Sequence, residues 1–298
     1  MSYYKIYFLL CCLILNLDLA LAAAVPNNNL MYIASYRGLF SAGFRLDIAK
    51  IIITQPYVRV KGSDISQIIV SLTTRNFTKV ELFFPMRFCY RTKFKTNTLA
   101  TQQADWISRL SNKATRGRTL YNNPSKKAIF LQVERKLNTR MIADDPRKQK
   151  INNLLWASNP DPDVYNVHLV NAKLPIIDRL TMLEWLRRQN LVSGMVFNLP
   201  VTDGRKLLGF NIKVVGEEKL KWRNSMVYSW KIRLQSKFSD NSDDRPIWMW
   251  LSKDKQRLPL LFSSSHALGS FQVRLVSVTA PAPICIIKEA TVLALPKY

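Results

Sequence analysis

The sequence has few histidines, few cysteines and few acidic residues. Its 298 residues include two histidines, four cysteines and 20 Asp and Glu residues against 44 Lys and Arg residues. Metal centres and hydrolytic triads are built largely from these scarce residue types. The chain also lacks the H-E-x-x-H, C-x-x-C and G-x-S-x-G motifs and a phosphate-binding glycine loop. We therefore predict no catalytic residues, no metal, no cofactor and no enzymatic activity.

Three polar stretches have only a superficial likeness to sites. Ser263-Ser-Ser-His266 puts serine beside histidine, but a catalytic triad is a spatial arrangement and not a run of neighbours. The acidic stretch 240–244 lacks the glycine and the glutamate that a calcium loop needs at its sixth and twelfth positions. Glu217-Glu218 is typical of a solvated turn. We interpret all three as turns, and a hydrolase of envelope polymer is the weakest of three functional hypotheses.

Long apolar runs are absent beyond the N-terminus. There, Lys5 precedes an apolar run over residues 6–15, and small residues follow at 20–24. This order is typical of a secretory signal peptide, and the run is shorter than the roughly 20 residues that span a bilayer. We predict a signal peptide over 1–22 and one β-rich domain over 23–298, exported to the periplasm and associated with the outer membrane. Cleavage after Ala24 and an uncleaved membrane anchor are the alternatives.

Cysteine usage leaves one question open. Cys11 and Cys12 fall inside the expected signal peptide, so the mature chain keeps Cys89 and Cys285. In an oxidising compartment these two can form one disulfide. Two separate buried thiols fit the sequence equally well, because spacing alone does not define the geometry of a bond.

The net charge of +24 points to an anionic partner. In the cytosol such a charge would suggest nucleic acid, but export changes the available anions. We expect the partner to be anionic lipid, lipopolysaccharide or another envelope protein, and not nucleic acid. We expect the protein to attach to the membrane peripherally. The alternative explanation for the charge is that the proteins of the source organism are generally basic. Residues 86–150 hold 16 Lys and Arg against 4 Asp and Glu. We expect this stretch to be a partly divergent or loop-rich basic insert.

Alternation of apolar and polar residues dominates the mature chain. Within 227–238, Trp230 alternates with Lys231 and Arg233, as expected of an amphipathic antiparallel strand. In the next strand, 246–251, Trp248 and Trp250 share one face and leave Met249 and Leu251 on the other. Similar patterns predict strands near 57–60, 67–72, 82–90, 129–137, 211–215, 258–262, 270–278 and 284–295.

Turn residues separate these strands. Gly38 and Gly43 allow two strands near the N-terminus to bend. Asp254 lies in a polar turn at 252–256, and Pro259 suits the start of the returning strand because it lacks an N–H donor. The pattern predicts a mainly β fold, a curved antiparallel up-and-down sheet or half-open barrel with one or two short helices.

Two segments have helical features. Over 178–190, leucines recur at helical spacing after Asp178, a suitable N-cap residue. A second short helix is expected over 104–110.

Several short motifs follow one another along the chain. They are Tyr36-Arg-Gly38 with Ala42-Gly43, Phe84-Pro85, Ile177-Asp178, residues 197–204, residues 247–254, and Arg257-Leu-Pro259. Taken in this order, they resemble an exported bacterial family, domain of unknown function 3108, most strongly over 195–278. The resemblance implies a curved envelope β-protein, similar in outline to the open barrels of lipoprotein carriers, whose concave face holds acyl chains. The family implies no catalytic residues.

Aromatic and basic residues interleave in the last third of the chain, where they form our candidate ligand site. The functional interpretation is a groove that holds an apolar chain while cations meet its anionic head; the simpler one is core tryptophans beneath a solvated basic face. Lipid or anionic-surface binding is therefore the first hypothesis, and assembly with an envelope protein through a strand edge is the alternative. The candidate residues are Trp222, Trp230, Trp248, Trp250, Lys231 and Arg233.

Overall fold

One large antiparallel sheet organises the chain. The computed structural model describes residues 29–54, 57–60, 63–110, 113–136, 165–172, 175–236 and 245–281. The strands are β1 (Asn29–Gly38), β2 (Arg45–Thr54), β3 (Tyr57–Val60), β4 (Ser63–Thr73), β5 (Met86–Lys95), β6 (Thr101–Leu110), β7 (Lys113–Asn122), β8 (Lys127–Lys136), β9 (Tyr165–Asn171), β10 (Ile177–Asp178), β11 (Val196–Leu199), β12 (Val201–Thr202), β13 (Phe210–Trp222), β14 (Ser225–Ser236), β15 (Ile247–Ser252), β16 (Pro259–His266) and β17 (Gly269–Ala280). The helices are η1 (Leu39–Ser41), α2 (Thr78–Phe83) and α4 (Arg179–Arg187).

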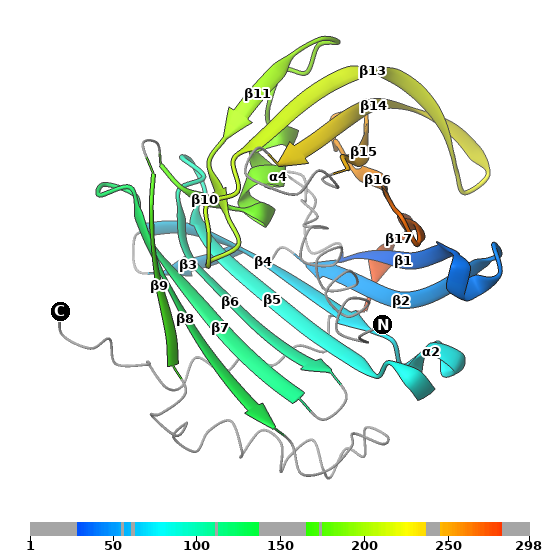
Figure 1. Cartoon of the computed structure of the whole chain (residues 1–298). Helices are drawn as coiled ribbons and strands as arrows, with labels where there is room; N and C mark the ends of the chain where they lie inside the picture. Colours follow the sequence, from blue (N-terminus) through cyan, green and yellow to red (C-terminus); the bar gives the residue numbers. More distant parts are fainter. Residues whose placement is uncertain are drawn as a thin grey trace.

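The sheet is open. Fourteen strands follow one path, β11-β13-β14-β15-β16-β17-β1-β2-β4-β5-β6-β7-β8-β9, and β3 pairs with β4 beside it. β10 and β12 form a separate two-stranded pair. Figure 1 shows β4 to β9 as a broad wall, while β11, β13 and β14 arch over α4. The mainly β, curved, half-open architecture expected from the alternation is therefore confirmed.

Alternation along each strand defines an inner face, which meets α4, and an outer face. A row of fully or nearly fully buried residues crosses six neighbouring strands on the inner face. Because successive side chains of a strand point to opposite faces, their neighbours in sequence point outward. The row is Ile232, Met249, Phe262, Val273, Ala34 and Ala49.

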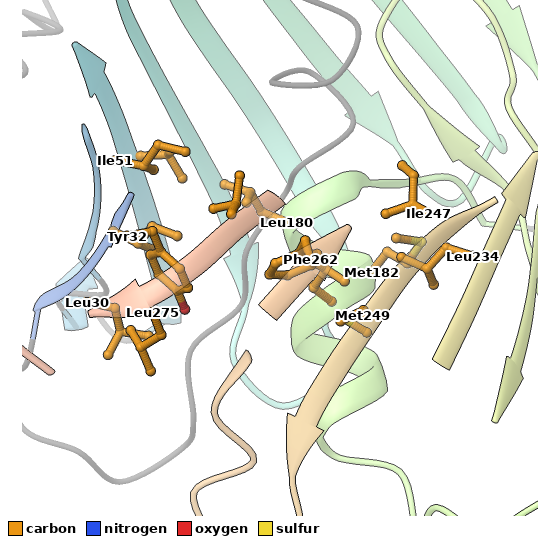
Figure 2. Packing of buried hydrophobic residues seen from close by; sticks show 14 of the residues in the cluster. Leu30, Tyr32, Ile51, Leu180, Met182, Leu234, Ile247, Met249, Phe262 and Leu275 are labelled. Carbon is orange, nitrogen blue, oxygen red and sulfur yellow. The ribbon is translucent and has the colours of Figure 1, made fainter. Parts of the chain in front are cut away.

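Helix α4 packs on this inner face. Leu180, Leu183 and Leu186 are buried in the main hydrophobic cluster, at the helical spacing noted in the sequence. Figure 2 shows Leu180 and Met182 of α4 among core residues of β14, β15 and β16. Asp178 is the N-cap, as predicted. The helix therefore occupies the concave side of the sheet.

Four secondary-structure predictions were wrong. Glu217-Glu218 lies in strand β13 and Ser263-Ser-Ser-His266 in strand β16, although both were expected to be turns, because each stretch pairs with neighbouring strands. Residues 104–110 belong to strand β6, because Trp106 and its alternate neighbours pair with both β5 and β7, and this pairing overrides a weak local helical pattern. The strand expected over 82–90 begins only at Met86. Helix α2 precedes it and ends before Phe84-Pro85, since proline disfavours helix in the residue before it.

The basic stretch also differs from expectation. Residues 86–136 form four regular strands, β5 to β8, which continue the main sheet instead of forming loops. Part of the remainder, 137–150, and the strand expected over 284–295 lie outside the described residues.

The predicted turn residues have the roles expected of them. Gly43 has a φ of +78°, and a Cβ on Gly38 would lie 2.3 Å from the carbonyl oxygen of Leu268. Asp254 Oδ1 accepts hydrogen bonds from the backbone N–H groups of residues 256 and 257, at 2.9 and 3.1 Å. Pro259 is the first residue of β16, and its carbonyl oxygen accepts a 3.0 Å hydrogen bond from the Tyr32 hydroxyl.

Candidate functional site

Lysine and tryptophan meet on the outer face of β14 and β15. The register pairs Lys231 with Trp250 and Arg233 with Trp248. The Lys231 Nζ atom lies 5.2 Å from the ring centre of Trp248 and 5.4 Å from that of Trp250, within cation–π range of both. The two strands thus bring four of the six predicted ligand residues together.

A carboxylate from β13 completes this contact. Glu218 lies 3.0 Å from the Lys231 ammonium and accepts a 3.1 Å hydrogen bond from Trp250 Nε1. The hydrogen bond from Lys231 lowers the pKa of Glu218, which is 41% exposed. Because Glu218 neutralises Lys231, the net positive charge of this face comes from its other cations.

Two arginines supply that charge. The Nε atoms of Arg233 and Arg274 are buried and have no hydrogen-bond partner. Neither arginine forms an ion pair with a residue in the described ranges. They lie on β14 and β17, strands that are three spacings or roughly 14 Å apart, and Arg274 is level with Lys231 in the register. We name the surface between and around them the outer tryptophan face: Lys213, Lys231, Arg233, Trp248, Trp250, Leu261 and Arg274.

The other two predicted tryptophans lie elsewhere. Trp222, at the β13–β14 tip, donates a 3.0 Å hydrogen bond from Nε1 to the Leu275 carbonyl. It lines a cavity of about 40 Å³ with Leu220, Lys221, Leu260, Leu261 and Arg274, a volume that suits water and not an acyl chain. Trp230 is 8% exposed and belongs to the inner core, with the Lys253 Nζ atom 4.7 Å from its ring centre. The simpler interpretation, a core tryptophan, therefore holds for Trp230.

Asp178 anchors the start of α4 to the wall of the sheet. Its Oδ1 atom accepts the backbone N–H groups of Leu180 and Thr181 at 2.8 and 3.3 Å. Its Oδ2 atom accepts the hydroxyls of Thr92 (2.7 Å) on β5 and Thr101 (3.1 Å) on β6, and also that of Thr181. Complete burial raises the pKa of Asp178 in spite of these hydrogen bonds. The residue is thus structural.

A buried ion pair anchors the other end of α4. Glu184 pairs with Arg187 at 3.2 Å and with Arg188 at 2.9 Å. Arg187 Nε donates to the Arg257 carbonyl (2.8 Å), and Arg187 Nη2 donates to the carbonyl of residue 256 (2.5 Å). Burial raises the pKa of Glu184 and lowers that of Arg187 to about 10. Because both ends of the helix are fixed, a ligand on this part of the inner face would have to displace α4.

A second charged row crosses the outer face of β5, β6 and β7. Asp105 pairs with Arg91 at 2.8 Å and with Arg118 at 2.6 Å, and all three residues are buried. Burial alone would raise the pKa of Asp105, but the hydrogen bonds from Arg118 and Arg91 outweigh it and lower the pKa. This arrangement holds three strands together and explains part of the positive charge of residues 86–136.

The remaining predicted residues give no catalytic geometry. Ser264 Oγ lies 3.1 Å from His266 Nε2, but Ser264 is 3% exposed and the two are alternate residues of one strand. The described residues contain no group of three or more His, Cys, Asp and Glu side chains that could hold a metal ion. Cys89 is disulfide-bonded, and Cys285 lies outside the described residues, as does the side chain of His168.

Sequence reasoning missed Arg274 and Leu261. The alternation over 270–278 already assigned Arg274 to the opposite face of its strand from Val273. Only the pairing of β15, β16 and β17 shows that Arg274 lies on the same face as the two tryptophans. That pairing order was the missing signal, because alternation assigns a face without naming the neighbouring strand.

Comparison with known proteins identifies a family and a fold. A family model described as "Protein of unknown function (DUF3108)" matches residues 31–276. The crystal structure of a beta-barrel-like protein of domain of unknown function DUF1849 from Brucella abortus is similar, with a TM-score of 0.50 and 9% identity; the match covers 85% of this chain and 97% of that one. No curated protein matches the chain. Neither description names a catalytic activity.

Proposed function

The chain belongs to the DUF3108 family of proteins of unknown function, and from this premise we propose that it binds an anionic lipid surface of the cell envelope without catalysing a reaction. The observation that carries the proposal is the pair of half-buried arginines Arg233 and Arg274, which lie on the same face of the sheet as Trp248 and Trp250 and have no ion-pair partner among the described residues. A guanidinium left without a partner is a ready donor for phosphate oxygens.

The chemistry of the outer tryptophan face suits a lipid headgroup region. Tryptophan is enriched where membrane meets water, because its ring is apolar while its N–H needs a polar partner. Each cation near an anionic membrane contributes on the order of 1 kcal/mol, and a net charge of +24 adds long-range attraction.

A surface site fits this fold better than the acyl-chain groove that the resemblance implied. Leu180, Leu183 and Leu186 of α4 fill the inner face beside them, and the ends of the helix are fixed by Asp178 and Glu184. Ligand pockets for molecules of lipid size need several hundred Å³. We therefore assign lipid contact to the outer face.

Export to the periplasm and peripheral attachment to the outer membrane are part of the same proposal. The expected signal peptide, 1–22, lies outside the described residues. Neither α2 nor α4 is long and apolar enough to cross a bilayer, and the described ranges contain no other helix that is.

Assembly with another envelope protein is the second candidate, because the sheet ends in open edges. Over residues 216–222, β14 is the only described strand that pairs with β13. This edge carries Glu217, Lys219 and Lys221, and charged side chains of this kind disfavour pairing with another strand. The lipid proposal therefore takes precedence.

We expect the mature chain to bind vesicles that contain phosphatidylglycerol and to bind neutral phosphatidylcholine vesicles much more weakly. The double substitution Arg233→Gln/Arg274→Gln should reduce the affinity for anionic vesicles about thirtyfold, because each arginine contributes roughly 1 kcal/mol near such a surface. Cosedimentation over a salt series measures this effect.

The matched control is Lys126→Gln/Lys255→Gln, which removes the same charge from two exposed turns. Its loss should stay within about threefold, since it changes only the long-range attraction. Equal losses in both variants would show that net charge acts without a defined face. If the wild-type chain does not bind anionic vesicles at low salt, the proposal is wrong.

A further inference from the structure

Five large apolar side chains are exposed at one end of the sheet. Leu39, Phe40 and Phe44 in the β1–β2 turn are 75%, 59% and 77% exposed, and Leu82 and Phe83 of α2 are 67% and 65% exposed. We call these five residues the apolar rim. Clusters of exposed apolar residues usually mark an interaction site.

The topology brings the two parts of the rim to the same end. β1 and β2 are antiparallel, and so are β2 and β4, so the β1–β2 turn and the β4–β5 connection leave the sheet on the same side. β2 pairs with β4 only from Lys50 onward, and α2 follows β4 after residue 73. Figure 1 shows the turn and α2 projecting from this end of the sheet.

Several backbone polar groups of the β1–β2 turn form hydrogen bonds within the turn. The Gly38 carbonyl accepts the N–H of Gly43 (3.0 Å), and the Ser41 carbonyl accepts the N–H of Phe44 (2.9 Å). The Ser41 hydroxyl donates to the carbonyls of Gly38 and Phe44, and Arg37 Nε donates to that of Gly43 (2.8 Å). Such internal pairing is the condition for backbone to enter an apolar medium, where no water can replace a missing hydrogen bond.

The turn is also held firmly. Tyr36 Oη donates to the Leu268 carbonyl at 2.5 Å, and the Leu39 N–H donates to the same oxygen at 3.2 Å. The Tyr36 ring packs 4.9 Å from that of Phe271, centre to centre. The exposed side chains therefore project from a fixed turn, which lowers the entropy lost on binding.

Positive charge surrounds the rim. Residues 37–47 and 75–87 hold five Lys and Arg residues against two carboxylates. Asp47 is bound by Arg45, and Glu81 by Arg87. Apolar tips with a surplus of cations suit an anionic lipid bilayer, in which acyl chains lie directly below phosphate groups.

We propose that the apolar rim inserts into the interfacial region of an anionic lipid bilayer and anchors the protein there. The inference depends on the proposed function and adds the point of insertion. The outer tryptophan face would then supply electrostatic attraction, while the rim supplies a contact that salt does not weaken.

Monolayer insertion separates this anchoring from adsorption. Injected beneath a phosphatidylglycerol monolayer, the wild-type mature chain should raise the surface pressure, and it should keep part of its vesicle binding at about 0.5 M salt, where surface charges are screened. Phe40→Ser/Phe44→Ser should abolish most of the pressure rise. In high salt it should weaken vesicle binding by about tenfold or more.

The matched control is Val192→Ser/Val196→Ser, which removes two valines that are 52% and 51% exposed in and just before the edge strand β11, six strands away from β1 in the sheet. It should change insertion less than about twofold. Thermal unfolding of both variants checks that the fold is kept, as expected for exposed positions.

Each outcome is decisive. If the phenylalanine variant inserts as well as wild type, or if wild type binds anionic vesicles without raising the monolayer pressure, the rim is not the anchor and the proposed function survives. If the rim variant instead loses self-association that wild type displays without lipid, the rim contacts a second copy and the inference is overturned. Absence of vesicle binding by wild type would remove both proposals.

Discussion

Replacement of Glu184 by alanine is expected to lower the free energy of unfolding by about 3–5 kcal/mol, because it leaves a buried arginine without its counter-charge. Glu184 and Arg187 have side chains that are 0% and 2% exposed. Burial dominates both groups, since the pKa of Glu184 is raised and that of Arg187 lowered although the two attract each other. Urea-induced unfolding measures the change.

Two further variants test the cause. Arg188→Ala removes the other partner of Glu184, but that side chain is 28% exposed, so the expected loss is roughly 1 kcal/mol. Glu184→Leu/Arg187→Met removes both buried charges and should recover part of the stability lost in the single variant. Recovery stays incomplete, because the carbonyls of residues 256 and 257 lose the Arg187 donors. If Glu184→Ala costs no more than Arg188→Ala, the pair does not anchor α4.

The sequence predicts strands β14, β15 and β17 and the first half of β16, and it predicts the faces of β14 and β15. Trp248 and Trp250 point outward while Met249 and Leu251 join the core, as alternation required. The period-two pattern works here because the inner face is uniformly apolar. It fails for 104–110, where the inner positions are Ala104, Trp106 and Ser108 and local chemistry does not distinguish strand from helix.

Long-range arrangement could not be predicted. The pairing of β1 with β17 joins segments more than 200 residues apart, and no local pattern identifies such a partner. The position of α4 likewise depends on Thr92 and Thr101 meeting Asp178 across the fold. For the candidate site, the sequence prediction grouped Trp230 with the outer tryptophans, although alternation along its strand already set it on the opposite face from Lys231. Only the pairing order added Arg274. The apolar rim was hidden because Phe40 and Phe44 look like core residues in sequence.

Asp178→Ala is expected to lower the free energy of unfolding by about 3 kcal/mol. The variant removes the N-cap of α4, whose loss typically costs about 1 kcal/mol. It also leaves the buried hydroxyls of Thr92 and Thr101 without their acceptor, which adds about 1–3 kcal/mol. Asp178→Asn should cost much less at neutral pH, because Oδ1 can still cap the helix and the buried charge is gone.

The pH dependence of that difference tests the mechanism. Burial raises the pKa of Asp178 above its ordinary 3.8, so the folded state holds the proton more tightly than the unfolded state does. Its contribution to stability is therefore complete below about pH 4 and is lost as the pH rises through the raised pKa. Between pH 4 and neutrality, the free energy of unfolding of wild type should consequently fall relative to that of Asp178→Asn. The fall should be about 1.4 kcal/mol for each unit by which the pKa is raised.

The control for replacing a carboxylate by an amide is Asp254→Asn, which makes the substitution in an exposed turn. A difference between wild type and Asp178→Asn that stays constant over this range would mean that the carboxyl is charged at its ordinary pKa, and that the inner face beside α4 is wet enough to solvate it.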